Sequence, residues 1–239
     1  SLLGGYLATR LSPRLVISAS LLLVAACLIL TGLSHSFEFA LTMRTLTGIG
    51  SAGSNVPIMA LASAWFASKR RGMATGVLVS GSSVALLLLG PLIPCILEAF
   101  PDGGWRICWY ILGSLTLAIA GLNYFVLRNR PEEKNLLPIG STLSPPSSPS
   151  SFSWSRVYAS RPLWHLAGIF FTFGFSYIIY MQFFSAYLIN EARISAEKAG
   201  SYLMLLGILS IFCGPFWGTV SDFIGRKYGL ALVFLIQGT

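Results

Sequence analysis

Charged residues are scarce in this chain of 239 residues, and their scarcity excludes most soluble folds. Asp, Glu, Lys and Arg together make up 10% of the sequence, whereas soluble domains carry about a quarter. So few charges cannot cover a surface that faces water, and 54% of the residues are hydrophobic. We therefore expect an integral membrane protein whose main solvent is lipid.

Three further absences narrow the function. The formal net charge is +8, but no basic stripe with interleaved aromatic residues is present, so we expect no nucleic-acid partner. The four cysteines show no metal-ligand spacing. No phosphate loop and no nucleophile–histidine–acid arrangement is visible. We therefore predict that the protein is not an enzyme and holds no cofactor or metal.

Continuous hydrophobic runs are what the sequence has instead. Each is about as long as the 20 residues that a membrane-crossing helix needs, whereas barrel strands would show alternating segments of about ten residues. We predict an all-α membrane protein with complete spans at 14–34, 37–66, 72–97, 104–127, 162–190 and 198–221. Partial helices at 1–9 and 229–239 lead us to expect a fragment truncated at both ends.

Lys and Arg gather in every second loop, which predicts that these loops face the cytoplasm. We expect a multi-pass protein of the plasma (cell inner) membrane. The longest loop, 128–161, is dominated by Ser and Pro over 141–150, as is typical of a flexible linker. It divides the chain into an N-terminal half, 1–127, and a C-terminal half, 162–239.

A short basic turn occurs once in each half. One copy, GTVSDFIGRK, runs from Gly218 to Lys227, and the other, GYLATRLSPR, runs from Gly5 to Arg14. Both copies separate hydrophobic runs, which indicates two related halves of one membrane protein. The first copy departs from the pattern, because Thr9 stands where the second copy has an acid.

The second copy resembles the G-x-x-x-D-x-x-G-R-K motif of the major facilitator superfamily of secondary transporters. This resemblance implies two pseudo-symmetric six-helix halves, with the chain running from the end of helix 2 into helix 9. Arg44-x-x-x-Gly48-x-Gly50 is similar to a family motif of helix 4. Gly81 and Gly90-Pro91 match the glycine-rich antiporter motif of helix 5 only in part. The segment 65–76, WFASKRRGMATG, resembles the helix 4–5 turn of the organic-anion carriers, including the monocarboxylate type.

Arg44 is the ionisable residue deepest inside a predicted span. A charge at the bilayer centre costs about 2.5–3.5 kcal/mol on insertion scales and usually faces the bundle interior or a wet cavity. We expect Arg44 to be an anion partner or a coupling residue; the alternatives are a side chain that snorkels towards the membrane surface or a structural pairing with another helix. Asn55 in the same span is a candidate to hydrogen-bond a substrate or a neighbouring helix.

Aromatic residues recur at helical spacing in the predicted span 162–190. They are Phe173, Tyr177, Tyr180, Phe184 and Tyr187, with Gln182 nearby. This stripe is either a cavity wall that offers hydroxyl groups to a substrate or a packed or lipid-facing surface, since both uses give the same spacing. We keep Tyr177, Tyr180 and Gln182 as candidate substrate residues.

The resemblance implies that the basic turns form a cytoplasmic gate that holds the outward-open state. An acid in such a turn can pair with bases or with a helix N-terminus, and anchoring at the cytoplasmic face is the alternative for the bases. The expected gate residues are Gly218, Asp222, Gly225, Arg226, Lys227, Gly5, Arg10 and Arg14. The residues expected to permit close or bent helix packing are Gly48, Gly50, Gly76, Gly81, Gly90 and Pro91.

The function that the resemblance implies is secondary active transport of a small solute by alternating access. We expect an organic anion, coupled to a proton or counter-ion gradient, and a monomer in the lipid bilayer. A drug/proton antiporter is the alternative within transport. A non-transporting membrane sensor or receptor on the same scaffold is the alternative from another class.

Overall fold

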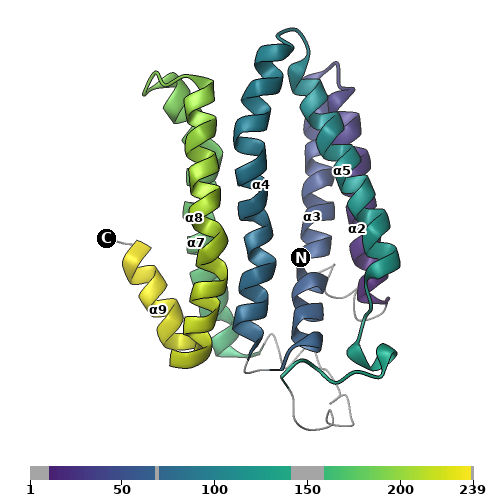
Figure 1. Cartoon of the computed structure of the whole chain (residues 1–239), viewed down its shortest axis with the longest axis vertical. Coiled ribbons are helices and arrows are strands. Elements are labelled where there is room, and N and C mark those ends of the chain that lie inside the picture. Colours follow the sequence, from purple (N-terminus) through teal and green to yellow (C-terminus); the bar gives the residue numbers. More distant parts are fainter. Residues whose placement is uncertain (1–10, 68–69, 141–158, 238–239) are drawn as a thin grey trace.

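Long helices make up almost all of the chain that the computed structural model describes, which is residues 11–67, 70–140 and 159–237 (Figure 1). Over these residues the extended structure is limited to one isolated β-bridge. The helices are α2 (Pro13–Gly32), α3 (Phe37–Trp65), α4 (Arg71–Ala99), α5 (Gly104–Val126), the 3₁₀ turn η2 (Pro131–Lys134), α7 (Arg161–Asn190), α8 (Ala196–Ile224) and α9 (Arg226–Gln237). The prediction of an all-α membrane protein is confirmed.

Five of these helices, α2, α4, α5, α7 and α8, are long and apolar enough to cross a membrane. Helix α3 has 29 residues and therefore the required length, but its Thr, Ser and Gly residues and Arg44 make it less apolar. Polar residues in a membrane helix usually face the protein interior or a wet cavity. The composition of α3 thus distinguishes it from the other predicted spans.

Local signals in the sequence explain where several helices begin and end. The hydroxyl of Ser36 accepts the backbone N–H of Phe39 at the start of α3, at 3.3 Å. Ser195 accepts the N–H of Lys198 in the same way at the start of α8. Gly225 ends α8 at φ 91°, a backbone conformation that side chains with a Cβ rarely adopt.

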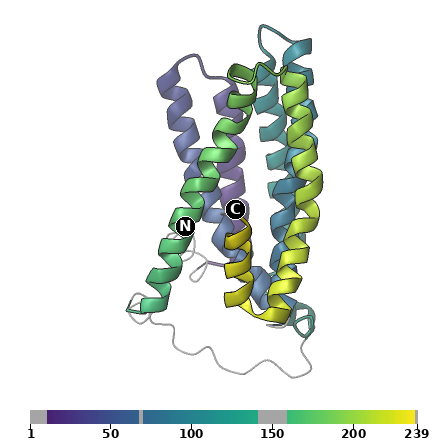
Figure 2. The same cartoon turned by 90° about the vertical axis from the view of Figure 1, so that its left-hand side faces the viewer.

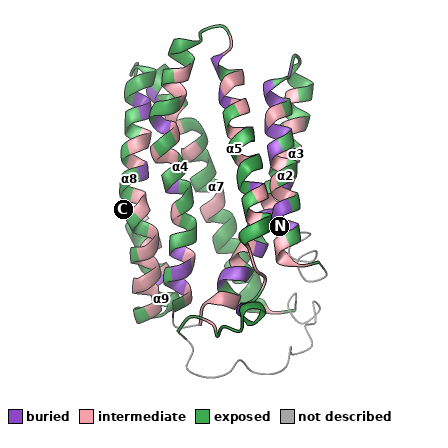
Figure 3. Cartoon of the chain, turned by 45° about the vertical axis from the view of Figure 1, so that its right-hand side comes forward, coloured by how far each residue is buried: buried purple, intermediate pink, exposed green. Residues whose placement is uncertain are grey.

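The helices form two packed groups. Helix α2 lies against α3 and α5, and α4 lies against α8. Figure 2 shows α3 and α7 on the same side of the α4–α8 pair, with α7 slanting across the bundle. Figure 3 shows that buried residues are frequent on α2 and rare on α7, where Leu188 is the one buried residue.

Glycines bring α4 and α8 into close contact. Gly76 lies against Gly214, and Gly90 lies against Gly200 farther along both helices, so the two helices run antiparallel. A Cβ added at any of these four positions would meet backbone atoms of the partner helix. Close backbone approach of this kind is a general means of packing membrane helices. Because α4 precedes the predicted linker and α8 follows it, this contact joins the two predicted halves.

The first part of the predicted linker is tied to the α3–α4 connection. Ile139 donates its N–H to the carbonyl of Trp65 at 2.8 Å and accepts the N–H of Ala67 at 3.1 Å. The indole N–H of Trp65 donates to the carbonyl of Arg128 at 3.2 Å. Residues 128–140 are thus held beneath the bundle, while 141–158, where Ser and Pro dominate, lie outside the described residues.

Candidate functional site

Asp222 in the second basic turn caps the N-terminus of α4. Its Oδ1 accepts the N–H of Gly72 at 3.1 Å, and its Oδ2 accepts the N–H of Met73 at 3.0 Å. The first N–H groups of a helix lack intrahelical partners and carry the positive end of the helix dipole. A carboxylate at this place therefore satisfies two free donors and complements the dipole, and it connects α8 to α4.

Arg226 completes the contact from the other side of the turn. Its Nη2 lies 3.1 Å from Asp222 Oδ1, and its side chain is 59% exposed, against 11% for the carboxylate. An exposed pair of this kind contributes about 0.2–1 kcal/mol, so the two backbone donors hold Asp222 more firmly than Arg226 does. The neighbouring base, Lys227, is exposed.

Glycines make the approach of this turn to α4 possible. A Cβ at Gly72 would meet both the Asp222 carboxylate and the backbone of Gly218, and a Cβ at Gly218 would meet the Gly72 carbonyl. Positive φ at Gly225 lets the chain turn from α8 directly into α9, which begins at Arg226. The motif glycines and Asp222 thus belong to one contact between the turn and the start of α4. Sequence reasoning alone did not identify the start of α4 as the partner of this turn.

The first basic turn is placed differently. Gly5 and Arg10 lie outside the described residues. Arg14 lies at the start of α2, where its N–H donates to Asn129 Oδ1 at 2.9 Å and its guanidinium stacks 4.5 Å from the ring centre of Tyr124. Its Nε is buried without a hydrogen-bond partner among the described residues. Arg14 therefore ties α2 to the end of α5 and has no part in the α4–α8 contact.

Arg44 lies near the end of the bundle opposite to the basic turn. Its guanidinium carbon is 4.8 Å from the ring centre of Trp109 on α5. It lines a cavity of about 500 Å³, hereafter the end cavity, with Trp109, His35, Trp105 and Arg106. Sequence reasoning missed Trp105, Arg106 and Trp109, although Trp105 and Trp109 stand at i, i+4 spacing that places them on one face of a helix.

Asn55 lies on the same face of α3 as Arg44. Eleven residues separate them, which returns a helix of 3.6 residues per turn to nearly the same direction. Gly48 and Ser51 lie between them at the same spacing, and all four residues are exposed. No heavy atom lies within 4 Å of a Cβ built on Gly48. This polar stripe of α3 faces away from α2, against which Gly50 on the other side of the helix packs.

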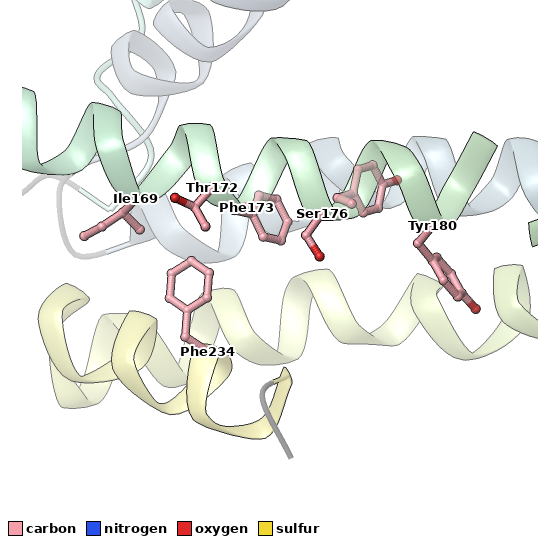
Figure 4. Close-up of a pocket in the computed structure, with 7 residues that line it drawn as sticks. Ile169, Thr172, Phe173, Ser176, Tyr180 and Phe234 are labelled. Carbon is pink, nitrogen blue, oxygen red and sulfur yellow. The ribbon is translucent and has the colours of Figure 1, made fainter. Parts of the chain in front are cut away.

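Tyr177 and Tyr180 line a cavity of about 790 Å³ between α7 and α9 (Figure 4). The rings of Phe173 and Tyr177 stack at 5.8 Å, and Phe234 of α9 meets Phe173 edge-on at 6.0 Å. The residues that line this cavity are Ile169, Thr172, Phe173, Ser176, Tyr177, Tyr180 and Phe234. Gln182 is exposed and is not among them. The structure thus groups the two tyrosines and leaves Gln182 apart.

The glycines predicted to pack helices divide into two sets. Gly50, Gly76 and Gly90 each have backbone or side-chain atoms of another helix against them, whereas nothing lies within 4 Å of a Cβ on Gly48 or Gly81. Pro91 is exposed inside α4. Sequence reasoning missed three partner glycines of α8, whose spacing is a usable signal of one packing face: they are Gly200, Gly207 and Gly214. Gly218, which was predicted as a gate residue, packs against α4 on the same face.

No group of His, Cys, Asp and Glu that could hold a metal ion is found over residues 11–67, 70–140 and 159–237. The polar chemistry of this region therefore consists of the capped α4–α8 contact, the end cavity, the stripe of α3 and the hydroxyl-bearing wall of α7.

Comparison with known families agrees with this arrangement. Residues 1–239 match the sequence profile described as Major Facilitator Superfamily. The chain belongs to this superfamily. Membership of the major facilitator superfamily confirms the predicted resemblance. It also confirms that the chain comes from a family of transporters and not of enzymes.

Curated superfamily members similar to the chain differ in their named solutes. The probable sulfoacetate transporter of Cupriavidus necator is 23% identical over 95% of the chain and 54% of its own length. The oxalate:formate antiporter of Oxalobacter formigenes is 27% identical over 98% of the chain and 53% of its length. The human synaptic vesicular amine transporter is 27% identical over 95% and 47%. The chain spans about half the length of these relatives, and no solved structure matches it.

Proposed function

We propose that the full-length protein is a secondary transporter that moves a small organic anion across the membrane by alternating access. The observation that carries this proposal is the contact between α4 and α8, one helix from each side of the predicted linker. It is a glycine-lined interface closed at one end by Asp222. Two rigid halves that rock against each other need such an interface, which can close tightly and be released by breaking few bonds.

The α4–α8 contact would act as the gate at the face that carries the basic turn. In this structure Asp222 is bound to the first N–H groups of α4, so this side of the interface is closed. Opening it would break the two charge-assisted hydrogen bonds between Asp222 and α4, whereas the Arg226–Asp222 pair lies within the turn from α8 to α9 and would stay intact. A cytoplasmic position for this face is supported by the Lys and Arg of its loops, and the plasma membrane is the expected location.

An organic anion is supported by the relatives and by Arg44. Similar proteins are named for sulfoacetate, hexuronate, and oxalate and formate. Arg44 has no carboxylate partner among the described residues, and it stands on the exposed polar stripe of α3 with Asn55. A guanidinium without a partner acid suits a carboxylate or sulfonate group. Coupling to a proton or a counter-ion gradient belongs to the same proposal.

The test is uptake of labelled oxalate, sulfoacetate and a hexuronate by the full-length protein in proteoliposomes, with and without a pH gradient. We expect uptake of at least one anion, and its loss in Arg44→Gln. The matched control is Lys198→Gln, because Lys198 is exposed at the same end of the molecule. Uptake that Arg44→Gln leaves intact would remove Arg44 from the proposal.

Two other results would replace the proposal. The similarity to vesicular amine transporters favours an amine as the second candidate solute. Uptake of an amine such as serotonin, with no uptake of any anion, would establish that alternative. Saturable binding of an anion without any flux under imposed gradients would instead favour a sensor or receptor on the transporter scaffold.

A further inference from the structure

Two arginines and a histidine from separate parts of the chain line the end cavity. His35 comes from the α2–α3 connection, Arg44 from α3 and Arg106 from the first turn of α5. No acid is among the residues that line it. Glu38 lies in the first turn of α3 but is not part of the lining. The volume of the end cavity, about 500 Å³, falls within the range of small-molecule sites.

Arg106 is fixed in place while most of its donors stay free. Its Nη2 donates to the carbonyl of Ser34 at 3.0 Å, and its guanidinium carbon lies 4.9 Å from the ring centre of Trp105. A guanidinium carries five N–H groups, and stacking occupies its face rather than its edge. The stack and the single hydrogen bond therefore hold the plane of Arg106 and leave N–H groups on its edge for an acceptor.

Arg44, from α3, is also stacked on a tryptophan of α5. Its guanidinium stacks on Trp109 at 4.8 Å, and no hydrogen bond or ion pair of its side chain is found in the described part of the chain. Over that part the one ion pair is the distant pair Arg226–Asp222. Two guanidinium groups thus face the same cavity with their charges unpaired. Arg44 is exposed and Arg106 is half-buried, and two cationic groups on one cavity attract an anion and can bind it through charge-assisted hydrogen bonds.

We propose that the end cavity is a capture site for an oxyanion, in which Arg44 and Arg106 bind the carboxylate or sulfonate group of the solute. The two tryptophans supply an apolar wall for the carbon skeleton. This proposal rests on the proposed function for the identity of the solute. Binding of the anion itself can be measured whether or not transport follows. It lies at the end of the bundle opposite to the Asp222 contact, where a solute arriving from that side would first meet the polar face of α3.

Isothermal titration calorimetry of the full-length protein tests this site directly. The protein is held in nanodiscs of zwitterionic lipid, and the probes are oxalate and sulfoacetate at millimolar concentration. We expect Arg106→Gln and Arg44→Gln each to weaken binding about tenfold, the effect of losing one charge-assisted hydrogen bond. Arg106→Lys keeps the charge without the planar fork and should restore part of the affinity. Lys198→Gln, which removes a charge at the same end outside the cavity, should bind as the wild type does.

Several results would overturn the capture site. They are absence of binding of both probes to the wild-type protein, unchanged affinity in both arginine variants, and an equal loss in Lys198→Gln. A phospholipid headgroup offers the same oxyanion chemistry, so the titration is repeated in nanodiscs with phosphatidylglycerol. Arg106-dependent binding of that lipid with no binding of the soluble probes would overturn the assignment to a solute.

The site and the proposed function fail in different ways. Binding that depends on both arginines, without uptake of any anion, would leave the capture site and remove the transport proposal. Uptake of an anion whose binding is unaffected by Arg106→Gln would leave transport and remove the capture site.

Discussion

Replacing Asp222 with asparagine tests the contact that joins α8 to α4. Asparagine keeps the shape of the side chain but loses its charge and replaces one acceptor oxygen with an amide. At most one of the hydrogen bonds from Gly72 and Met73, at 3.1 and 3.0 Å, can then remain. The variant therefore removes one charge-assisted bond and the interaction of a carboxylate with the N-terminus of α4.

The expected magnitude follows from these two losses. A hydrogen bond to a charged group contributes about 1.5–3 kcal/mol, and an acid at a helix N-terminus contributes about 0.3–1 kcal/mol. The low ends of these two ranges add to about 2 kcal/mol, which corresponds to a shift of about 30-fold in the ratio of closed to open forms. Arg226→Gln removes only the exposed pair, worth at most about 1 kcal/mol, and should shift this ratio by about fivefold or less.

Pulsed electron–electron resonance can measure this shift in the full-length protein. Spin labels at Phe223→Cys and Arg130→Cys, both exposed, report the separation of the two halves in a background without the native cysteines. We expect a longer-distance population that grows in Asp222→Asn and much less in Arg226→Gln. Glu197→Gln, an acid removed from the first turn of α8, is the control. Unchanged distances in Asp222→Asn, or equal changes in all three variants, would refute the reasoning.

Three further substitutions test the packing around this contact. Gly76→Leu should separate α4 from α8 and cut uptake about tenfold, because overpacking costs about 1–3 kcal/mol, whereas Gly81→Leu, with open space at its Cβ, should keep uptake. Gly225→Ala should lower stability in thermal unfolding by about 1–2 kcal/mol because of its positive φ, with Gly81→Ala unchanged. Ile139→Pro should speed amide exchange at Ala67 by loosening the β-bridge, and Ile139→Ala, which keeps the donated N–H, should not.

The helices were predictable from sequence because lipid imposes a minimum length on each hydrophobic run. The helix predicted at 104–127 is α5, Gly104–Val126. The end of α8 was harder to place, since the polar residues before Gly225 resemble a loop. In the structure α8 continues to Ile224, because Asp222 is used on the helix surface rather than in a turn. The Asp222 carboxylate accepts its hydrogen bonds from the backbone of α4. The backbone of α8 therefore stays helical at Asp222.

The partners of the candidate site residues could not be predicted from one sequence. Asp222 was predicted to be a gate residue, and its place at the N-terminus of α4 depends on the antiparallel docking of two helices that are distant in sequence. Arg44 was identified from its depth in a span, whereas its stacking on Trp109 depends on how α5 lies against α2. Spacing identifies which residues share a face, and tertiary packing decides what that face meets.

The α3–α4 connection is where the linker and the gate contact come together. Ile139 binds the backbone of Trp65 and Ala67 on one side of this connection, and Asp222 binds the first N–H groups of α4 on the other. The two contacts are therefore separated by only a few residues along the chain. Contacts that act on one short segment are not independent, so the strength of the Asp222 contact should depend on whether the β-bridge is intact. Residues 128–140 would then contribute to the stability of the contact between Asp222 and α4.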